Sequence, residues 1–221
     1  LDDNKPVIGL FPGSRQSEIK RLLPIIVESA KQIIAAKPDS QFVIPVASTL
    51  KEEDILPYFE DTEFDMRVIH HRSHDVMQAC DAIVTVSGTV TLEIALMQKP
   101  MVVINKISAF SYFFVSRMLK IDHIALCNIV AGKRIVPELI QNDAQPDKIA
   151  NTLCELIDNK ELNTNITTEL GGIKDKLSDD KLKTDLSTLL IDMVENKNRS
   201  EDHTSELQSQ HDLVCRLRLE K

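Results

Sequence analysis

Two glycine-containing turns constrain this chain more than any other feature, because each follows an apolar run and precedes a helical segment. The first turn is Gly13 to Arg15, after the apolar residues 7–10, and the second is Ser87 to Thr89, after residues 83–86. A glycine lets the backbone approach a ligand, and the helix N-terminus that follows offers unpaired N–H groups and partial positive charge. Such a turn suits a phosphate, so two of them predict a nucleotide cleft.

The apolar runs alternate with segments of helical periodicity. Strands are predicted at residues 7–10, 42–46, 66–69, 83–86 and 101–104, and further helices at 51–59, 75–80 and 89–97. Strands that alternate with helices form right-handed βαβ units and a parallel sheet covered on both faces. The sequence therefore predicts an α/β fold with a doubly wound parallel sheet.

The helix after the first turn has the clearest apolar stripe, which runs from Ile19 to Ile34 in steps of three and four residues. Ser17 is predicted to be its N-cap, and Pro38 is predicted to end it. Pro24 lies inside this helix and is expected to kink or restart it, because proline has no N–H to donate.

Residues beyond Asn105 follow a different pattern. The sequence predicts an aromatic helix at 109–119, a short strand at 124–129 and a brief helix opened by Pro137. The aromatic helix either contacts lipid or packs in the core, and burial is the favoured alternative.

An amphipathic helix is predicted at residues 146–158 and a polar helical segment at 163–198, which Gly171-Gly172 is expected to break near its start. They have few expected partners, and the chain begins with Leu1 rather than Met, so we expect a fragment whose missing half covers these helices. The predicted organisation is a nucleotide-binding domain at 1–145, C-terminal helices at 146–198, and a tail at 199–221.

The tail, residues 199–221, closely resembles the translation of a common DNA-sequencing adapter in one frame. We therefore expect it to be an artefact without selected structure, and disordered. The alternative is a native amphipathic tail, but residues 200–210 show little helical periodicity.

The composition excludes several classes of protein. A net charge of −8 argues against a nucleic-acid-binding surface, and no apolar stretch reaches the length of a membrane span. The four cysteines lack CxxC spacing, which indicates a reduced cytosolic protein without structural zinc. No metal site or cofactor is predicted.

Each turn has a chemical and a structural interpretation. Gly13, Ser14 and Arg15 suit phosphate oxygens, but could equally form an ordinary βα turn with a surface arginine. Ser87, Gly88 and Thr89 could hold a ligand or only cap a helix. Glu93, four residues after Thr89, would repel phosphate but could accept hydrogen bonds from both ribose hydroxyls; otherwise it is a helix-dipole partner.

His70, His71, Arg72 and His74 form a small cationic cluster after the third predicted strand. No carboxylate or cysteine has matching metal-ligand spacing, so a loop that edges the cleft is favoured over a metal site. No catalytic triad can be argued from the sequence.

The chain resembles the C-terminal half of lipid-A-disaccharide synthases, which are inverting glycosyltransferases of the GT-B type. The matching segments are Phe11-Pro-Gly-Ser-Arg15 with Glu18-Ile19, Ser87-Gly-Thr-Val-Thr-Leu-Glu93, Pro100-Met-Val-Val103 with Lys106, Asn128-Ile-Val-Ala-Gly132 and Val136-Pro-Glu-Leu-Ile-Gln141. Two positions depart from the family pattern, which usually has proline at Cys127 and an aromatic residue at Asn105.

The resemblance implies transfer of diacylglucosamine from UDP-2,3-diacylglucosamine to 2,3-diacylglucosamine 1-phosphate, with release of UDP, in lipid A biosynthesis. Residues 13–15 and 87–89 would then bind the diphosphate and Glu93 the ribose. Asn128, Glu138 and Gln141 would lie near the donor sugar. The missing N-terminal half would supply the catalytic base and the lipid acceptor site, so this fragment alone is expected to be inactive. The implied location is cytoplasmic, with peripheral contact at the inner face of the inner membrane.

Two alternatives remain open on the residues alone. One is another GT-B enzyme, such as a UDP-N-acetylglucosamine epimerase or a peptidoglycan-precursor transferase. The other is a non-catalytic nucleotide-binding module, for example a receiver-like domain, although its acidic metal cluster is absent from the strand ends.

Overall fold

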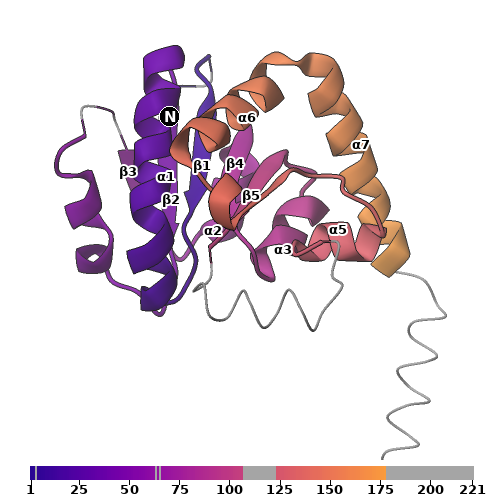
Figure 1. Cartoon of the computed structure of the whole chain (residues 1–221), viewed down its shortest axis with the longest axis horizontal. Coiled ribbons are helices and arrows are strands. Elements are labelled where there is room, and N and C mark those ends of the chain that lie inside the picture. Colours follow the sequence, from indigo (N-terminus) through magenta and orange to yellow (C-terminus); the bar gives the residue numbers. More distant parts are fainter. Residues whose placement is uncertain (3, 63, 65, 107–122, 178–221) are drawn as a thin grey trace, which may run out of the picture. The chain divides into compact units, whose positions relative to one another are not determined.

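The computed structural model describes residues 1–2, 4–62, 64, 66–106 and 123–177. Within these residues, six strands form one sheet in which every pair of neighbours is parallel, in the order β3-β2-β1-β4-β5-β6 (Figure 1). The strands are β1 Val7–Phe11, β2 Gln41–Val46, β3 Met66–His70, β4 Ala82–Val86, β5 Met101–Asn105 and β6 Glu138–Ile140. The order steps outward from β1 in one direction and from β4 in the other, which confirms the predicted doubly wound sheet.

Helices cover both faces of this sheet. They are α1 Gln16–Ala36, α2 Ser73–Ala79, α3 Val90–Leu96, α5 Leu126–Ala131, α6 Pro146–Asp158 and α7 Lys160–Leu177, with 3-10 turns η1 Glu52–Asp54, η2 Leu56–Phe59 and η3 Gln141–Asp143. Right-handed crossovers place α1 on one face and α2 and α3 on the other. The C-terminal helix α6 packs beside α1 and also contacts β4 and β5 (Figure 1).

The core follows from the apolar runs of the sequence. The central strands β1 and β4 are buried along their whole length, as expected for parallel strands covered on both faces. From α1, the predicted stripe supplies Ile19, Leu23, Ile26 and Ile33, each at most 2% exposed. Each such side chain contributes about 1.5–3 kcal/mol on burial.

The helix α1 differs from its prediction at two positions. It is continuous through Pro24, which is exposed; the proline removes the donor for the carbonyl of Lys20, also an exposed residue. Its N-cap is Arg15 rather than Ser17, because the backbone at Arg15 is extended and its carbonyl accepts the N–H groups of Glu18 and Ile19.

Between residues 124 and 140, the predicted types of the secondary-structure elements are wrong. Residues 126–131 form the helix α5, where a strand was expected, and Glu138 to Ile140 form the strand β6, where a helix was expected. Local periodicity cannot separate such short segments. The α5 helix ends at Gly132, whose φ of 72° is the left-handed conformation of a C-cap.

The predicted helix at 146–158 is confirmed by α6, but Gly171-Gly172 does not break α7. Gly171 lies beside the Gln98 side chain, where a Cβ would make an ordinary contact at 3.5 Å, and a Cβ on Gly172 would meet no atom within 4 Å, so both positions fit a continuous helix. One compact unit spans Leu1 to Lys176, and therefore α6 and nearly all of α7 belong with the sheet. The predicted aromatic helix at 109–119 and the tail at 199–221 lie outside the described residues.

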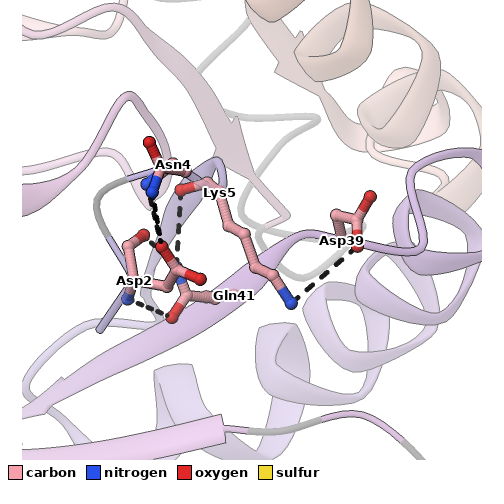
Figure 2. Close-up of polar contacts among 5 residues, drawn as sticks. All are labelled: Asp2, Asn4, Lys5, Asp39 and Gln41. Carbon is pink, nitrogen blue, oxygen red and sulfur yellow. Dashed lines mark hydrogen bonds and ion pairs between the residues drawn. The ribbon is translucent and has the colours of Figure 1, made fainter.

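The residues before β1 are held to the start of β2 by polar contacts (Figure 2). The N–H of Asp2 donates to Gln41 Oε1 at 2.8 Å, and Gln41 Nε2 donates to the Asp2 carbonyl at 2.8 Å. The Asn4 N–H bonds the Asp2 carboxylate and lowers its pKa, and Lys5 pairs with Asp39 at 3.9 Å. These contacts fix the chain at the amino-terminal edge of the sheet. Within the described chain, no helix has the length and apolarity that a membrane crossing requires.

Two buried thiols give a pH-dependent prediction. Burial raises the pKa of Cys80 to about 12 and that of Cys127 to about 11, from an ordinary value of 9.0. The folded chain keeps both thiols neutral where the unfolded chain ionises them, so the free energy of unfolding should fall as the pH rises above about 9. At pH 8.5, both should resist alkylation by iodoacetamide until urea unfolds the chain, as peptide mass spectrometry would show; reaction in the native state would contradict this.

Candidate functional site

The two predicted turns leave the same edge of the sheet from neighbouring strands. In the β1–β4 ladder, Phe11 pairs with Thr85, and each lies two residues before the turn that follows its strand. The strand order reverses between β1 and β4, and ligands of doubly wound sheets bind in the crevice outside the carboxyl ends at that point. Topology therefore brings residues 13–15 and 87–89 together.

The first turn is shaped around an internal carboxylate. Gly13 has a φ of 104°, which L side chains rarely adopt, and a Cβ there would overlap Glu18 Oε2 and approach Val86 Cγ2 to 3.1 Å. Glu18 Oε2 accepts the N–H groups of Ser14 at 3.2 Å and Arg15 at 3.3 Å. Arg15 Nη1 donates to Glu18 Oε1 at 3.1 Å, although 78% of the arginine side chain is exposed.

Glu18 is thus a residue whose role was not foreseen. In the sequence Glu18 stands out only as part of the first segment that resembles the family, but its carboxylate accepts from Ser14 and Arg15, which are predicted to bind a diphosphate. A signal was present in the sequence: a glutamate at the third helical position commonly bonds back to the N-cap backbone. With Ser17 as the predicted N-cap, Glu18 would be the first helical residue; with the observed N-cap at Arg15, it is the third.

In the second turn, Ser87 is hydrogen-bonded within the described part of the protein, whereas the backbone N–H groups of the next two residues are not. The Ser87 N–H donates to the Ile104 carbonyl in β5 at 3.0 Å, and its hydroxyl donates to the Ile124 carbonyl at 2.8 Å. In contrast, the N–H groups of Gly88 and Thr89 meet no acceptor among the described residues. A Cβ on Gly88 would meet no atom within 4 Å, so this turn has open space beside it.

Thr91 supports the second turn from beneath, a role that nothing in the sequence indicated. Its fully buried hydroxyl donates to the Gly88 carbonyl at 2.8 Å and accepts the Leu126 N–H at 3.1 Å. The turn is thereby tied to the first residue of α5.

Glu93 lies on α3 and contacts the histidine cluster. His74 Nε2 lies 3.1 Å from Glu93 Oε2, and both side chains are well exposed, at 64% and 45%. Arg72 pairs with Asp75 at 2.6 Å, so the predicted cationic cluster is partly neutralised by carboxylates. The carboxylate of Glu93 remains accessible at the carboxyl edge of the sheet.

Asn128 and Glu138 belong to one buried hydrogen-bond network. Asn128 Nδ2 donates to Glu138 Oε1 at 2.7 Å and to the Val136 carbonyl at 2.9 Å. Glu138 also accepts the N–H groups of Ile124 and Ala125, at 3.1 and 3.0 Å, directly before α5. Both side chains therefore act inside the protein. The Glu138 carboxylate caps α5, and the Asn128 amide joins α5 to the residues that precede β6.

Gln141 follows β6 and adopts a φ of 54°. Its Nε2 atom is buried and has no hydrogen-bond partner in the described part of the chain. The structure thus places a strained residue with an unsatisfied donor at the carboxyl end of the strand next to β5.

A hollow of about 450 Å³ adjoins the first turn, between α1 and the η1–η2 segment. Its lining includes Gln16, Lys20, Asp54 and Tyr58. Another hollow, of about 650 Å³, lies at the opposite, amino-terminal edge near Pro6 and Pro100. The sheet edge between the two turns is not part of either.

These features define a Rossmann-like α/β domain. Similar solved structures include Anabaena Alr3699/HepE in complex with UDP-glucose (TM-score 0.59, 16% identity, 86% of this chain and 49% of that one). Another is UDP-GlcNAc 2-epimerase from Neisseria meningitidis bound to UDP-GlcNAc (TM-score 0.54, 18% identity, 83% of this chain and 46% of that one). At these identities the similarity shows the fold.

The chain belongs to the lipid-A-disaccharide synthetase family, whose model matches residues 1–189. It is 48% identical over 191 residues to lipid-A-disaccharide synthase from Nitrosococcus oceani, covering 86% of this chain and 49% of the relative. The enzyme of that name from Geobacter sulfurreducens is 46% identical over 194 residues, covering 88% and 50%. The chain therefore spans about half the length of these relatives.

The family assignment decides between the sequence-based alternatives. The match runs through both turns and the 128–141 region, so it favours this family over an epimerase or a receiver-like module. One departure from the family pattern also finds a physical explanation. Cys127 is the second residue of α5, where a helix tolerates the usual proline because that N–H has no intrahelical acceptor.

Proposed function

We propose that this chain is the donor-binding half of a glycosyltransferase of lipid A biosynthesis. The whole enzyme would join UDP-2,3-diacylglucosamine to 2,3-diacylglucosamine 1-phosphate and release UDP. The observation that carries the proposal is the adjacency of the two turns at the reversal point of a sheet whose sequence belongs to this family.

The charges and donors of the two turns suit a departing diphosphate. The exposed Arg15 guanidinium can bind phosphate oxygens in a planar fork, and the Gly88 and Thr89 N–H groups offer further donors. Charge that develops on the leaving group would be stabilised by these fixed donors. Ser14 and Ser87 would line the same site, although the Ser87 donors are used within the protein.

Glu93 would accept hydrogen bonds from the ribose hydroxyls, since its carboxylate is accessible and stands one helical turn from the second turn. Gln141 would lie near the donor sugar, where a sugar hydroxyl could accept from its unsatisfied Nε2. Asn128 and Glu138 would shape that region from inside the protein rather than touch the sugar.

The acceptor site and the catalytic base would come from the other half of the enzyme. This chain would then bind the donor with little or no turnover by itself. The substrates carry acyl chains, so the whole enzyme would work in the cytoplasm at the inner face of the inner membrane.

Calorimetric titration of the chain with UDP tests the donor site. Arg15→Ala and Glu93→Ala should each weaken binding by about tenfold, because each removes a charged partner of the ligand. Lys133→Ala provides a matched loss of a surface charge, since Lys133 lies beyond the C-terminal end of α5 and pairs with Glu169 of α7 at 2.9 Å. Equal UDP affinity in all four proteins would refute the site.

A further inference from the structure

One carboxylate occupies the first turn in a way that an anionic ligand would. Glu18 receives two backbone N–H groups and one guanidinium nitrogen, from Ser14 and Arg15, at 3.1–3.3 Å. Its side chain is 26% exposed, so it lies against the turn rather than in solvent. The absence of a side chain at Gly13 leaves the space that this carboxylate fills.

A diphosphate and the Glu18 carboxylate cannot use these donors together. Each N–H and each guanidinium nitrogen would have to exchange one anion for the other, and the two anions repel at close range. The contact is short in sequence and part of a helix cap, so the glutamate can leave by side-chain rotation without unfolding α1.

We propose that Glu18 is an internal competitor for the donor's diphosphate, which must displace it from the Ser14 and Arg15 donors. This inference rests on the proposed function of the site. In the unliganded chain Glu18 holds Arg15 and the turn in place; in the bound chain Arg15 pairs with phosphate instead. The glutamate therefore lowers the affinity for any diphosphate ligand and makes its release easier.

Calorimetric titration of Glu18→Gln with UDP tests the proposal. Glutamine keeps the size and one acceptor oxygen but removes the charge, so we expect the Kd for UDP to fall by about fivefold or more at low salt. The gain should shrink as salt rises, because screening weakens repulsion near the surface. Uridine, which has no phosphate, should bind both proteins equally.

Glu28→Gln is the matched control. It makes the same charge change on an exposed residue of α1, about 15 Å further along the helix, and should leave the Kd unchanged. A scaffolding role for Glu18 predicts the opposite sign, namely weaker UDP binding in Glu18→Gln.

The outcomes separate the two proposals. If the wild type binds UDP and Arg15→Ala weakens binding, but Glu18→Gln binds no more tightly than the wild type, the competitor role is overturned and the donor site stands. If neither the wild type nor Glu18→Gln binds UDP, both proposals fall. Binding by Glu18→Gln alone would support competition in its strongest form.

Discussion

Replacing Glu138 with alanine is expected to lower the free energy of unfolding by about 3 kcal/mol. The carboxylate is 7% exposed and satisfies the N–H groups of Ile124 and Ala125 as well as Asn128 Nδ2. Its removal leaves these donors without their acceptor, and each unsatisfied buried group costs about 1–3 kcal/mol. The loss of a negatively charged cap at the start of α5 adds to this cost. Urea unfolding followed by circular dichroism measures the change.

Glu169→Ala is the control for this prediction. Glu169 lies on the exposed side of α7 and pairs with Lys133 at 2.9 Å, and a surface pair of this kind contributes at most about 1 kcal/mol. Asn128→Ala should resemble Glu138→Ala, because it breaks the same network. Stabilities of the Glu138 and Glu169 variants within experimental error of each other would show that the network does not hold α5.

The sheet was predictable because its strands are buried on both faces. A short, largely apolar run such as residues 7–10 or 83–86 is typical of a strand that is covered on both faces, and alternation with amphipathic helices favours the parallel topology. A parallel topology also places the two turns at the carboxyl edge of the sheet, because each turn follows a strand. Their adjacency follows from the order β1-β4, which the crossover rules favour but local sequence does not encode.

The region from 124 to 140 was not predictable in the same way. Its elements are short, and its fold depends on contacts between residues ten or more apart, such as Glu138 with Ile124 and Asn128 with Glu138. Candidate residues with polar side chains were identified there, but sequence could not distinguish a side chain turned toward a ligand from one that caps a helix. At the first turn, the predicted N-cap Ser17 lies two residues after the observed N-cap Arg15. With the N-cap at Arg15, Glu18 is the third helical residue and its carboxylate can bond back to the turn.

Gly13→Ala is expected to lower the free energy of unfolding by about 2 kcal/mol and to weaken UDP binding by at least about tenfold. The backbone at φ 104° is strained for any L side chain, and the new Cβ would press on Glu18 Cβ at 3.2 Å and Val86 Cγ2 at 3.1 Å. It would also displace the Glu18 carboxylate, which removes the helix cap and also the competing anion, so the expected weakening of UDP binding comes from the new methyl group alone. The methyl group would then occupy the side of the turn that the diphosphate is proposed to approach.

Gly132→Ala separates backbone strain from this loss of space. Gly132 also has a positive φ, 72°, but a Cβ there meets no atom within 4 Å, so its substitution should cost only about 1 kcal/mol and leave UDP binding unchanged. The difference between the two variants therefore measures what the close approach at Gly13 requires. If both variants lost equal stability and both bound UDP like the wild type, the first turn would be an ordinary strained loop, and Gly13 would have no part in binding a phosphate.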